Sequence, residues 1–199
     1  MSLPTLEFDG EPESFAPVEL QSVCDRTEKP GTAAFRKFVL AHQGGKDLGI
    51  LRECSVGRAV SEHKEGRAWD WGMSASSASD SARVEQLLDW LFAADAALFR
   101  RAGLQYIIWN KKIWSTTSRA WRDYSGPNAH TDHVHFSFSW PGANGETSLY
   151  KAIPKASSQV GPMSDAAEDE PFLGLLRGAL FLSASALGWA LASRFARKV

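Results

Sequence analysis

The 199-residue sequence lacks an excess of either charge, because 22 lysines and arginines stand against 23 aspartates and glutamates. A nucleic-acid-binding chain normally carries a clear basic surplus, so we expect no nucleic-acid partner. The basic residues between 111 and 122 have acidic neighbours and fit a solvated surface. Hydrophobic residues make up 44% of the chain, which excludes a disordered composition and suits one folded domain with a core.

The first twenty residues lack both the positively charged start and the apolar run of a signal peptide. They are acidic and contain proline. We expect a disordered acidic tail over residues 1–20, followed by a folded domain over residues 21–150.

Cysteine is scarce, and no C-x-x-C spacing predicts a thiolate metal site. The only two cysteines, Cys24 and Cys54, flank one predicted helix. A disulfide between them would close a loop of roughly 30 residues and contribute about 3–4 kcal/mol. It would indicate an oxidising compartment. Two unpaired buried thiols are the alternative.

Apolar residues at helical spacing predict two helices in this domain. One covers residues 32–42 and ends at a glycine pair. The other follows the N-capping residues 79–81 and carries an apolar stripe up to a stop at Gly103.

Alternating or short apolar runs predict the strands. We expect a short strand with a loop within residues 48–56, and a hairpin over residues 104–115 that turns at 110–112. From His133 onward the pattern predicts a half-buried strand whose polar face carries His133 and His135.

The chain changes character after residue 150. Residues 151–171 are rich in Ser, Pro, Ala and acidic residues and read as a flexible linker. Residues 172–193 form an apolar segment that as a helix would be about 33 Å long, enough to cross a bilayer core of about 30 Å. The basic tail 194–199 predicts a cytoplasmic C-terminus and an outward-facing domain. The alternative is an apolar helix docked on a protein partner.

Four of the five histidines fall into two clusters. His63 precedes Asp70 in "SEHKEGRAWD", and His130, His133 and His135 lie in "HTDHVH". In a strand, His133 and His135 share a face, and a bend at 64–66 allows His63 and Asp70 to meet them. Two imidazoles and a carboxylate with an open fourth position are the ligand set of a hydrolytic zinc site.

These two motifs together resemble the zinc peptidases of the lysostaphin-type, D-Ala-D-Ala carboxypeptidase and Sonic hedgehog group, and more closely actinobacterial secreted domains of the hedgehog/DD-peptidase fold. The resemblance covers residues 24–142. It implies an α+β fold with a small central antiparallel sheet and flanking helices, to which the C-terminal transmembrane helix would be added.

The resemblance also implies roles for single residues. His63, Asp70 and His135 would bind zinc, and His133 would be a general base or transition-state stabiliser. His130 matches a further histidine in some members of the group. Carboxypeptidases of the group carry a glutamate where this chain has Asp132, so the base is His133 or Asp132, with His133 preferred. Independently of the resemblance, Ser61 and Arg67 flank the site and could orient substrate.

The sequence therefore predicts a membrane-anchored zinc metallopeptidase that cleaves stem peptides or cross-links of peptidoglycan outside the cytoplasm. Hedgehog proteins keep the fold and its zinc as binding modules. The alternative is thus a non-catalytic, zinc-stabilised module for cell-wall binding or assembly, belonging to a phage or contractile particle. In that case the protein would be a virion or particle component.

Overall fold

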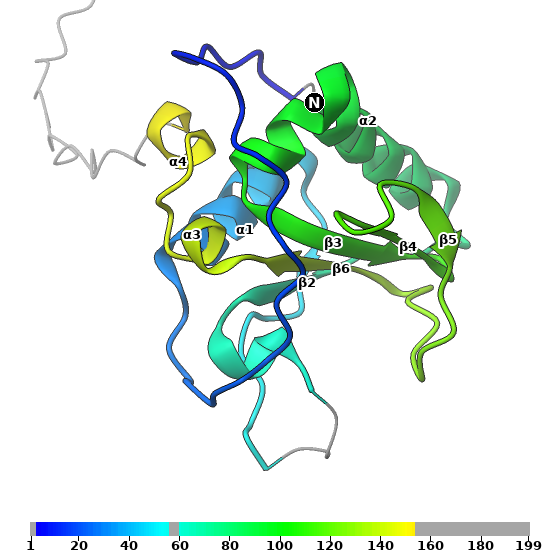
Figure 1. Ribbon diagram of the computed structural model, residues 1–199. Helices are drawn as coiled ribbons and strands as arrows, with labels where there is room; N and C mark the ends of the chain where they lie inside the picture. Colours follow the sequence, from blue (N-terminus) through cyan, green and yellow to red (C-terminus); the bar gives the residue numbers. More distant parts are fainter. Residues whose placement is uncertain (1–2, 56–59, 154–199) are drawn as a thin grey trace, which may run out of the picture. The chain divides into compact units, whose positions relative to one another are not determined.

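The structure, a computed structural model, describes residues 3–55 and 60–153. Its centre is a six-stranded sheet in the order β1-β2-β6-β3-β4-β5, with all neighbours antiparallel. The expected α+β class with a central antiparallel sheet is confirmed (Figure 1). The strands are β1 (Lys46–Asp47), β2 (Ala68–Gly72), β3 (Leu104–Trp109), β4 (Lys112–Ser115), β5 (Trp121–Asp123) and β6 (His133–Phe138).

The register of the strands gives the sheet two distinct faces. One row of partners runs Trp69, Phe136, Ile107, Trp114 and Trp121 across the sheet from β2 to β5. The next row carries Asp70, His135 and Ile108 on the opposite face. Because side chains alternate along a strand, the aromatic row is the core face and the polar row is the site face.

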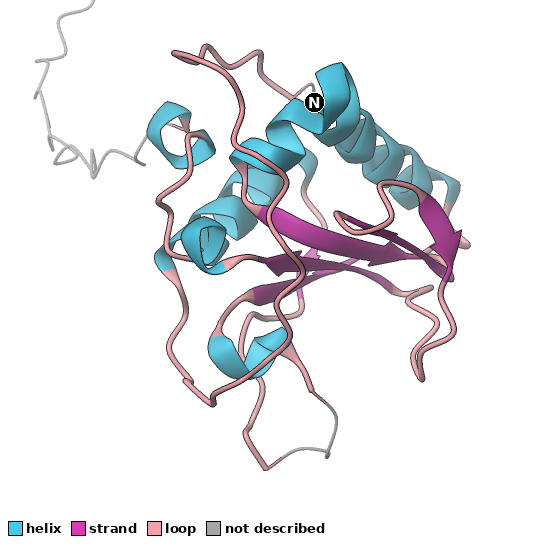
Figure 2. Ribbon diagram, viewed as in Figure 1, coloured by secondary structure: helices cyan, strands magenta, loops and turns pink. Residues whose placement is uncertain are grey.

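Helices α1 (Pro30–Gln43) and α2 (Ala78–Arg101) cover the core face (Figure 2). Phe35 of α1 makes edge contacts with Trp69 and Phe136, with ring centroids 6.2 and 5.3 Å apart. Phe99 of α2 packs on Trp114 at 4.6 Å. The short helices are η1 (Glu62–Glu65), α3 (Trp140–Ala143) and α4 (Leu149–Ala152).

Both predicted helices and the predicted hairpin are present. The N-cap of α2 is Ser77, whose hydroxyl accepts from the amide of Asp80, rather than a residue within 79–81. The α2 helix is also kinked at residues 93–96, where Ala94, Asp95 and Ala96 have positive φ. The apolar stripe continues across the kink, which is why the pattern gives no sign of it.

Residues 3–20 differ from the disordered tail that the composition predicts. The Trp90 indole donates to the Pro4 carbonyl at 3.0 Å, and the Arg100 guanidinium donates to the Glu13 carbonyl at 2.6 Å. Phe15 packs on Trp114, with ring centroids 6.1 Å apart. The segment therefore packs along the domain through backbone carbonyls and a few spaced apolar side chains, which a composition average does not register.

The predicted strand within 48–56 is also wrong for its described part, because residues 48–53 form an irregular segment. The ladder with β2 ends after Asp47, and Gly49 takes a φ of +102°, which ends a regular strand. Two ladder-like bonds persist, from the Leu48 amide to the Asp70 carbonyl at 3.0 Å and from the Asp70 amide to the Gly49 carbonyl at 3.2 Å.

Among the described residues, no helix is long and apolar enough to cross a membrane. The predicted span over 172–193 and the basic tail 194–199 lie outside the described residues, as does the linker 151–171 except for its first three positions.

Candidate metal centre

His63 lies on η1, a short helix at the position where the sequence predicts a bend. Its ring is 3% exposed. Gly66 ends the helix with φ +69°, and a Cβ there would lie 2.2 Å from the Thr27 carbonyl oxygen. Only glycine suits this left-handed position against a crossing chain. The glycine of the motif thus allows η1 to turn directly into β2.

Strands β2 and β6 bring the other two predicted ligands together. Asp70 and His135 are direct partners in the ladder, 65 residues apart in sequence. His133 pairs with Gly72 and extends the same face. All six residues of β6 are buried, so the expected half-buried strand is wrong; His133 and His135 on its polar face line a pocket together with η1 and the loop before β6.

The three predicted ligand atoms form a small triangle. Asp70 Oδ1 lies 2.9 Å from His135 Nδ1 and 3.1 Å from His63 Nε2, and the two nitrogens are 3.3 Å apart. Tetrahedral zinc with bonds of about 2.1 Å holds its ligand atoms about 3.4 Å apart. A small expansion of the triangle would therefore accommodate the ion. This buried group could hold a metal ion.

Neighbouring groups orient the ligands. His63 Nδ1 donates to the Ile50 carbonyl at 2.8 Å, which leaves Nε2 with a free lone pair facing Asp70. The Tyr106 ring stacks on His135 with centroids 5.5 Å apart, and its hydroxyl donates to Glu62 at 2.6 Å. Burial and then the Glu62 carboxylate raise the pKa of Tyr106, so this hydroxyl remains a donor.

Protonation within the group favours metal binding. Burial acts to raise the pKa of Asp70, but the neighbouring His135 and His63 imidazoles outweigh it and hold the pKa well below its ordinary value. Burial is the largest cause that acts on His135 and lowers its pKa, against the opposing effect of the Asp70 carboxylate. The carboxylate is thus ionised and the His135 imidazole neutral near neutral pH, as metal ligands must be.

His133 lies beside the triangle and pairs with Asp132. Its Nδ1 lies 2.7 Å from Asp132 Oδ1, while its Nε2 lies 3.8 Å from Asp70 Oδ1. Asp132 is 80% exposed, and the hydrogen bond from His133 lowers its pKa. The His133 ring therefore stands between a solvated carboxylate and the metal triangle. Asp132 reaches the site only through His133.

His130 also reaches the centre, although it precedes strand β6. Its ring centroid lies 4.6 Å from His133 and 5.8 Å from His135. Its Nδ1 donates to the Asn128 carbonyl at 2.7 Å. Burial, followed by the neighbouring His135 side chain, lowers the pKa of His130 to about 4. His130 is thus a neutral imidazole near pH 7.

The triangle opens into a pocket of about 290 Å³. Several residues that line the pocket were not predicted from the sequence, among them Arg52, Tyr106, Tyr124 and Asn128. Arg52 is 47% exposed, with its guanidinium 3.9 Å from Asp70 Oδ2. Arg52 lies in a segment that the sequence predicts as a strand, and nothing in that pattern marks it as a site residue. The two tyrosines could have been found, Tyr106 from the alternation of β3 and Tyr124 from the polarity of the loop after β5.

Only one of the two residues predicted to orient substrate lines the pocket. Ser61 lines the pocket, and its amide donates to the Gln21 side chain at 2.9 Å. Arg67 does not line it: this side chain has no exposed surface and pairs with Glu65. Its guanidinium also donates to the Phe138 carbonyl at 2.6 Å and stacks 4.7 Å from the Trp140 ring. Arg67 precedes β2 by one residue and faces the interior.

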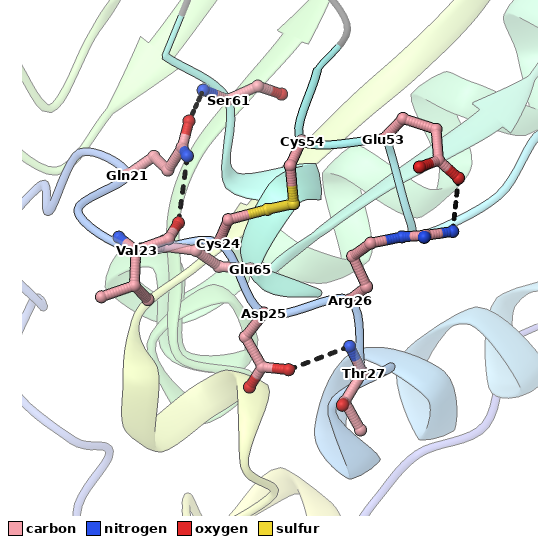
Figure 3. The surroundings of a disulfide bond; sticks show 10 residues. All are labelled: Gln21, Val23, Cys24, Asp25, Arg26, Thr27, Glu53, Cys54, Ser61 and Glu65. Atoms are coloured by element: carbon pink, nitrogen blue, oxygen red, sulfur yellow. Dashed lines mark hydrogen bonds and ion pairs between the residues drawn. A yellow bond between two sulfur atoms is a disulfide. The ribbon is translucent and has the colours of Figure 1, made fainter.

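Cys24 and Cys54 form a disulfide, with Cα atoms 6.0 Å apart. Cys54 follows Arg52 by two residues, so the bond lies at the end of the segment that carries one wall of the pocket. Its surroundings appear in Figure 3.

Comparison with known protein families gives a match. Residues 24–135, more than half of the chain, match the family model described as "VldE, C-terminal domain". The matched range begins at the first cysteine and ends at His135. No curated protein and no solved structure matches the chain.

Proposed function

The chain belongs to the family described as VldE, C-terminal domain, and from its candidate metal centre we propose that this member is a zinc-dependent peptidase acting on stem peptides or cross-links of peptidoglycan. The observation that carries the proposal is the triangle of His63, Asp70 and His135 at the base of an open pocket, with the His133–Asp132 pair beside it. The finer fold assignment, hedgehog/DD-peptidase-like, is part of the same proposal.

Zinc would be held by His63 Nε2, Asp70 Oδ1 and His135 Nδ1, which leaves the pocket side for substrate. When bound, zinc supplies a Lewis acid that polarises an amide carbonyl and lowers the pKa of water. The two imidazoles and one carboxylate with an accessible fourth side are the ligand pattern of catalytic rather than structural zinc sites.

His133 is the group best placed to move the proton. The Asp132 carboxylate accepts from Nδ1, so Nε2 is the free nitrogen, and it faces the triangle. An imidazole oriented by a carboxylate can take a proton from an attacking water and return it to the leaving amine. His130 has its Nδ1 proton committed to Asn128, so its Nε2 can only accept.

Substrate binding falls to the pocket wall. The half-exposed Arg52 guanidinium fits a carboxylate or carbonyl of a peptide, and Ser61 lies on the same wall. The pocket carries both acidic and basic side chains, which suits a short peptide with mixed polar groups. We further propose that residues 172–193 anchor the domain at a membrane with the domain outside the cytoplasm.

Purified murein provides the direct test. The zinc-loaded protein is incubated with sacculi, and new amine groups and released fragments are measured by chromatography and mass spectrometry. We expect products that a chelator abolishes, that added zinc restores, and that His133→Ala reduces by a factor of about 100 or more. His42→Gln is the matched control, because His42 bonds the Phe38 carbonyl at the end of α1, away from the pocket.

Two results would contradict the proposal. Products that persist after complete removal of metal would assign the activity to something other than this centre. Binding to sacculi without turnover, undiminished in His133→Ala, would instead favour the non-catalytic wall-binding module.

A further inference from the structure

Residues 50–52 hold the His63 imidazole in place. The Ile50 carbonyl accepts from His63 Nδ1 at 2.8 Å, and the Arg52 amide donates to the His63 carbonyl at 3.2 Å. Ile50 has no exposed surface, so its carbonyl is the stable partner of this ring nitrogen. Residues 50–52 thus bind His63 through both its side chain and its backbone.

The same segment also contacts the second ligand. Its earlier residues, Leu48 and Gly49, exchange backbone hydrogen bonds with Asp70. Its other side faces solvent, since Leu48 and Leu51 are 52% and 40% exposed. A few hydrogen bonds therefore hold an irregular, partly exposed segment against two of the three candidate ligands.

The disulfide fastens the far end of this segment. Cys54 is bonded to Cys24, whose neighbours are themselves docked on η1: the Asp25 amide donates to the Lys64 carbonyl at 2.8 Å. The Gln21 side chain accepts from the Ser61 amide at 2.9 Å (Figure 3). The bond thus connects residues 50–54 to the short helix that carries His63.

We infer that the Cys24–Cys54 disulfide is a positioning element of the metal centre. It keeps the Ile50 carbonyl on His63 Nδ1, and so it maintains the tautomer and ring orientation that present Nε2 to the metal. Outer partners of metal-binding histidines typically contribute 10–100-fold in metal affinity. The inference concerns metal binding by this chain and does not depend on whether murein is cleaved.

The test compares the wild type with the double variant Cys24→Ser/Cys54→Ser. Zinc affinity is measured by competition with a chromophoric chelator, at a temperature where circular dichroism shows both proteins folded. Nitrogen NMR of the metal-free proteins reports which ring nitrogen of His63 carries the proton. We expect about tenfold weaker zinc binding and a shift from the Nδ1–H form to a mixture of tautomers. Serine is used because free thiolates would bind zinc themselves.

A matched control separates positioning from general stability. Val39→Ala removes buried methyl groups from α1 and destabilises the core, but Val39 lies in the core cluster on the other face of the sheet. We expect its zinc affinity and its His63 tautomer to match those of the wild type. If the serine variant does not fold, phosphine reduction of the folded wild type followed by alkylation of both thiols opens the same bond.

Unchanged zinc affinity and an unchanged tautomer in the opened protein would overturn the inference. Equal weakening in the opened protein and in Val39→Ala would overturn it as well, because the disulfide would then act only through global stability. Both readouts are taken without murein, so failure of the hydrolysis test leaves this inference standing and the reverse also holds.

Discussion

Asp70 and His135 lie directly opposite each other in the β2–β6 ladder, and their side chains meet at 2.9 Å on the site face. Since each supplies one atom of the metal triangle, Asp70→Asn or His135→Gln should remove most zinc binding. Saturating zinc at about 100 times its Kd should stabilise the wild type by about 2.7 kcal/mol. We expect this gain to vanish in both variants. Metal analysis after dialysis and thermal unfolding with and without zinc measure it.

His42→Gln provides the comparison for these ligand variants, because it changes a histidine outside the triangle. Retention of full zinc binding by Asp70→Asn would show that the metal lies elsewhere.

His133→Gln should separate catalysis from metal binding. The ring is not part of the triangle, so zinc affinity should change by no more than about threefold, whereas turnover should fall by a factor of 100 or more. Asp132→Asn should have a smaller effect, because it only weakens the orientation of the ring. Steady-state rates and zinc competition on the same preparations test this. Greater loss in Asp132→Asn than in His133→Gln would make Asp132 the base.

The Glu65–Arg67 pair should matter for folding and not for substrate. Both side chains are fully buried, and removal of one partner leaves an unpaired buried charge that costs about 3–5 kcal/mol. We expect Arg67→Met to lower the free energy of unfolding by about this amount, and Glu65→Gln/Arg67→Met by less. Urea unfolding measures both. A raised KM in Arg67→Met with unchanged stability would restore the substrate role that its sequence position suggested.

The same pair predicts a loss of stability in acid. Burial acts to raise the pKa of Glu65, but the amides of Val23 and Ser22 and the Arg67 guanidinium together hold it below its ordinary 4.5. Because the folded pKa is depressed, the ionised carboxylate stabilises the fold fully above pH 4.5, and this contribution is lost as the pH falls below that value. Urea midpoints between pH 7 and pH 3 should fall less steeply in Glu65→Gln than in the wild type. Parallel curves would contradict this assignment.

Gly66→Ala should destabilise the domain and weaken the metal centre together. The residue has φ +69°, and the added Cβ would lie 2.2 Å from the Thr27 carbonyl oxygen. Strain of this kind costs about 1–3 kcal/mol. Thermal unfolding and zinc competition measure the two effects. Gly10→Ala is a control at a positive φ where nothing lies within 4 Å of the added Cβ. Equal effects of the two substitutions would show that contact with Thr27 is unimportant.

Local patterns predicted much of the fold. The stripe of α1, the hairpin of β3 and β4 and the alternation of β6 follow from spacing alone, because each reflects contacts with one surface. The packing of residues 3–20 does not follow from spacing, since it depends on backbone carbonyls that meet Arg100 and Trp90 from far along the chain. The kink in α2 does not follow either, because the apolar stripe continues across it.

The candidate site shows the same division. The three residues of its candidate metal group could be predicted to lie together, because two short motifs carry them at defined spacing. Arg67 could not be placed correctly, because its position beside β2 looks the same whether the side chain faces the pocket or the interior. Arg52 and the Ile50 carbonyl were missed because they belong to an irregular segment, where side-chain type gives no hint of which backbone groups face a distant histidine.

The alternation of Trp69, Asp70 and Trp71 along β2 makes the candidate metal group depend on the register of β2 against β6. If β2 slipped by one residue against β6, an indole would replace the carboxylate opposite His135 and the three donor atoms would separate. Only the native alignment offers all three at once. If the zinc ion that we propose binds during folding, it would stabilise chains in which these two residues, 65 positions apart in sequence, have paired in the correct register over misaligned chains.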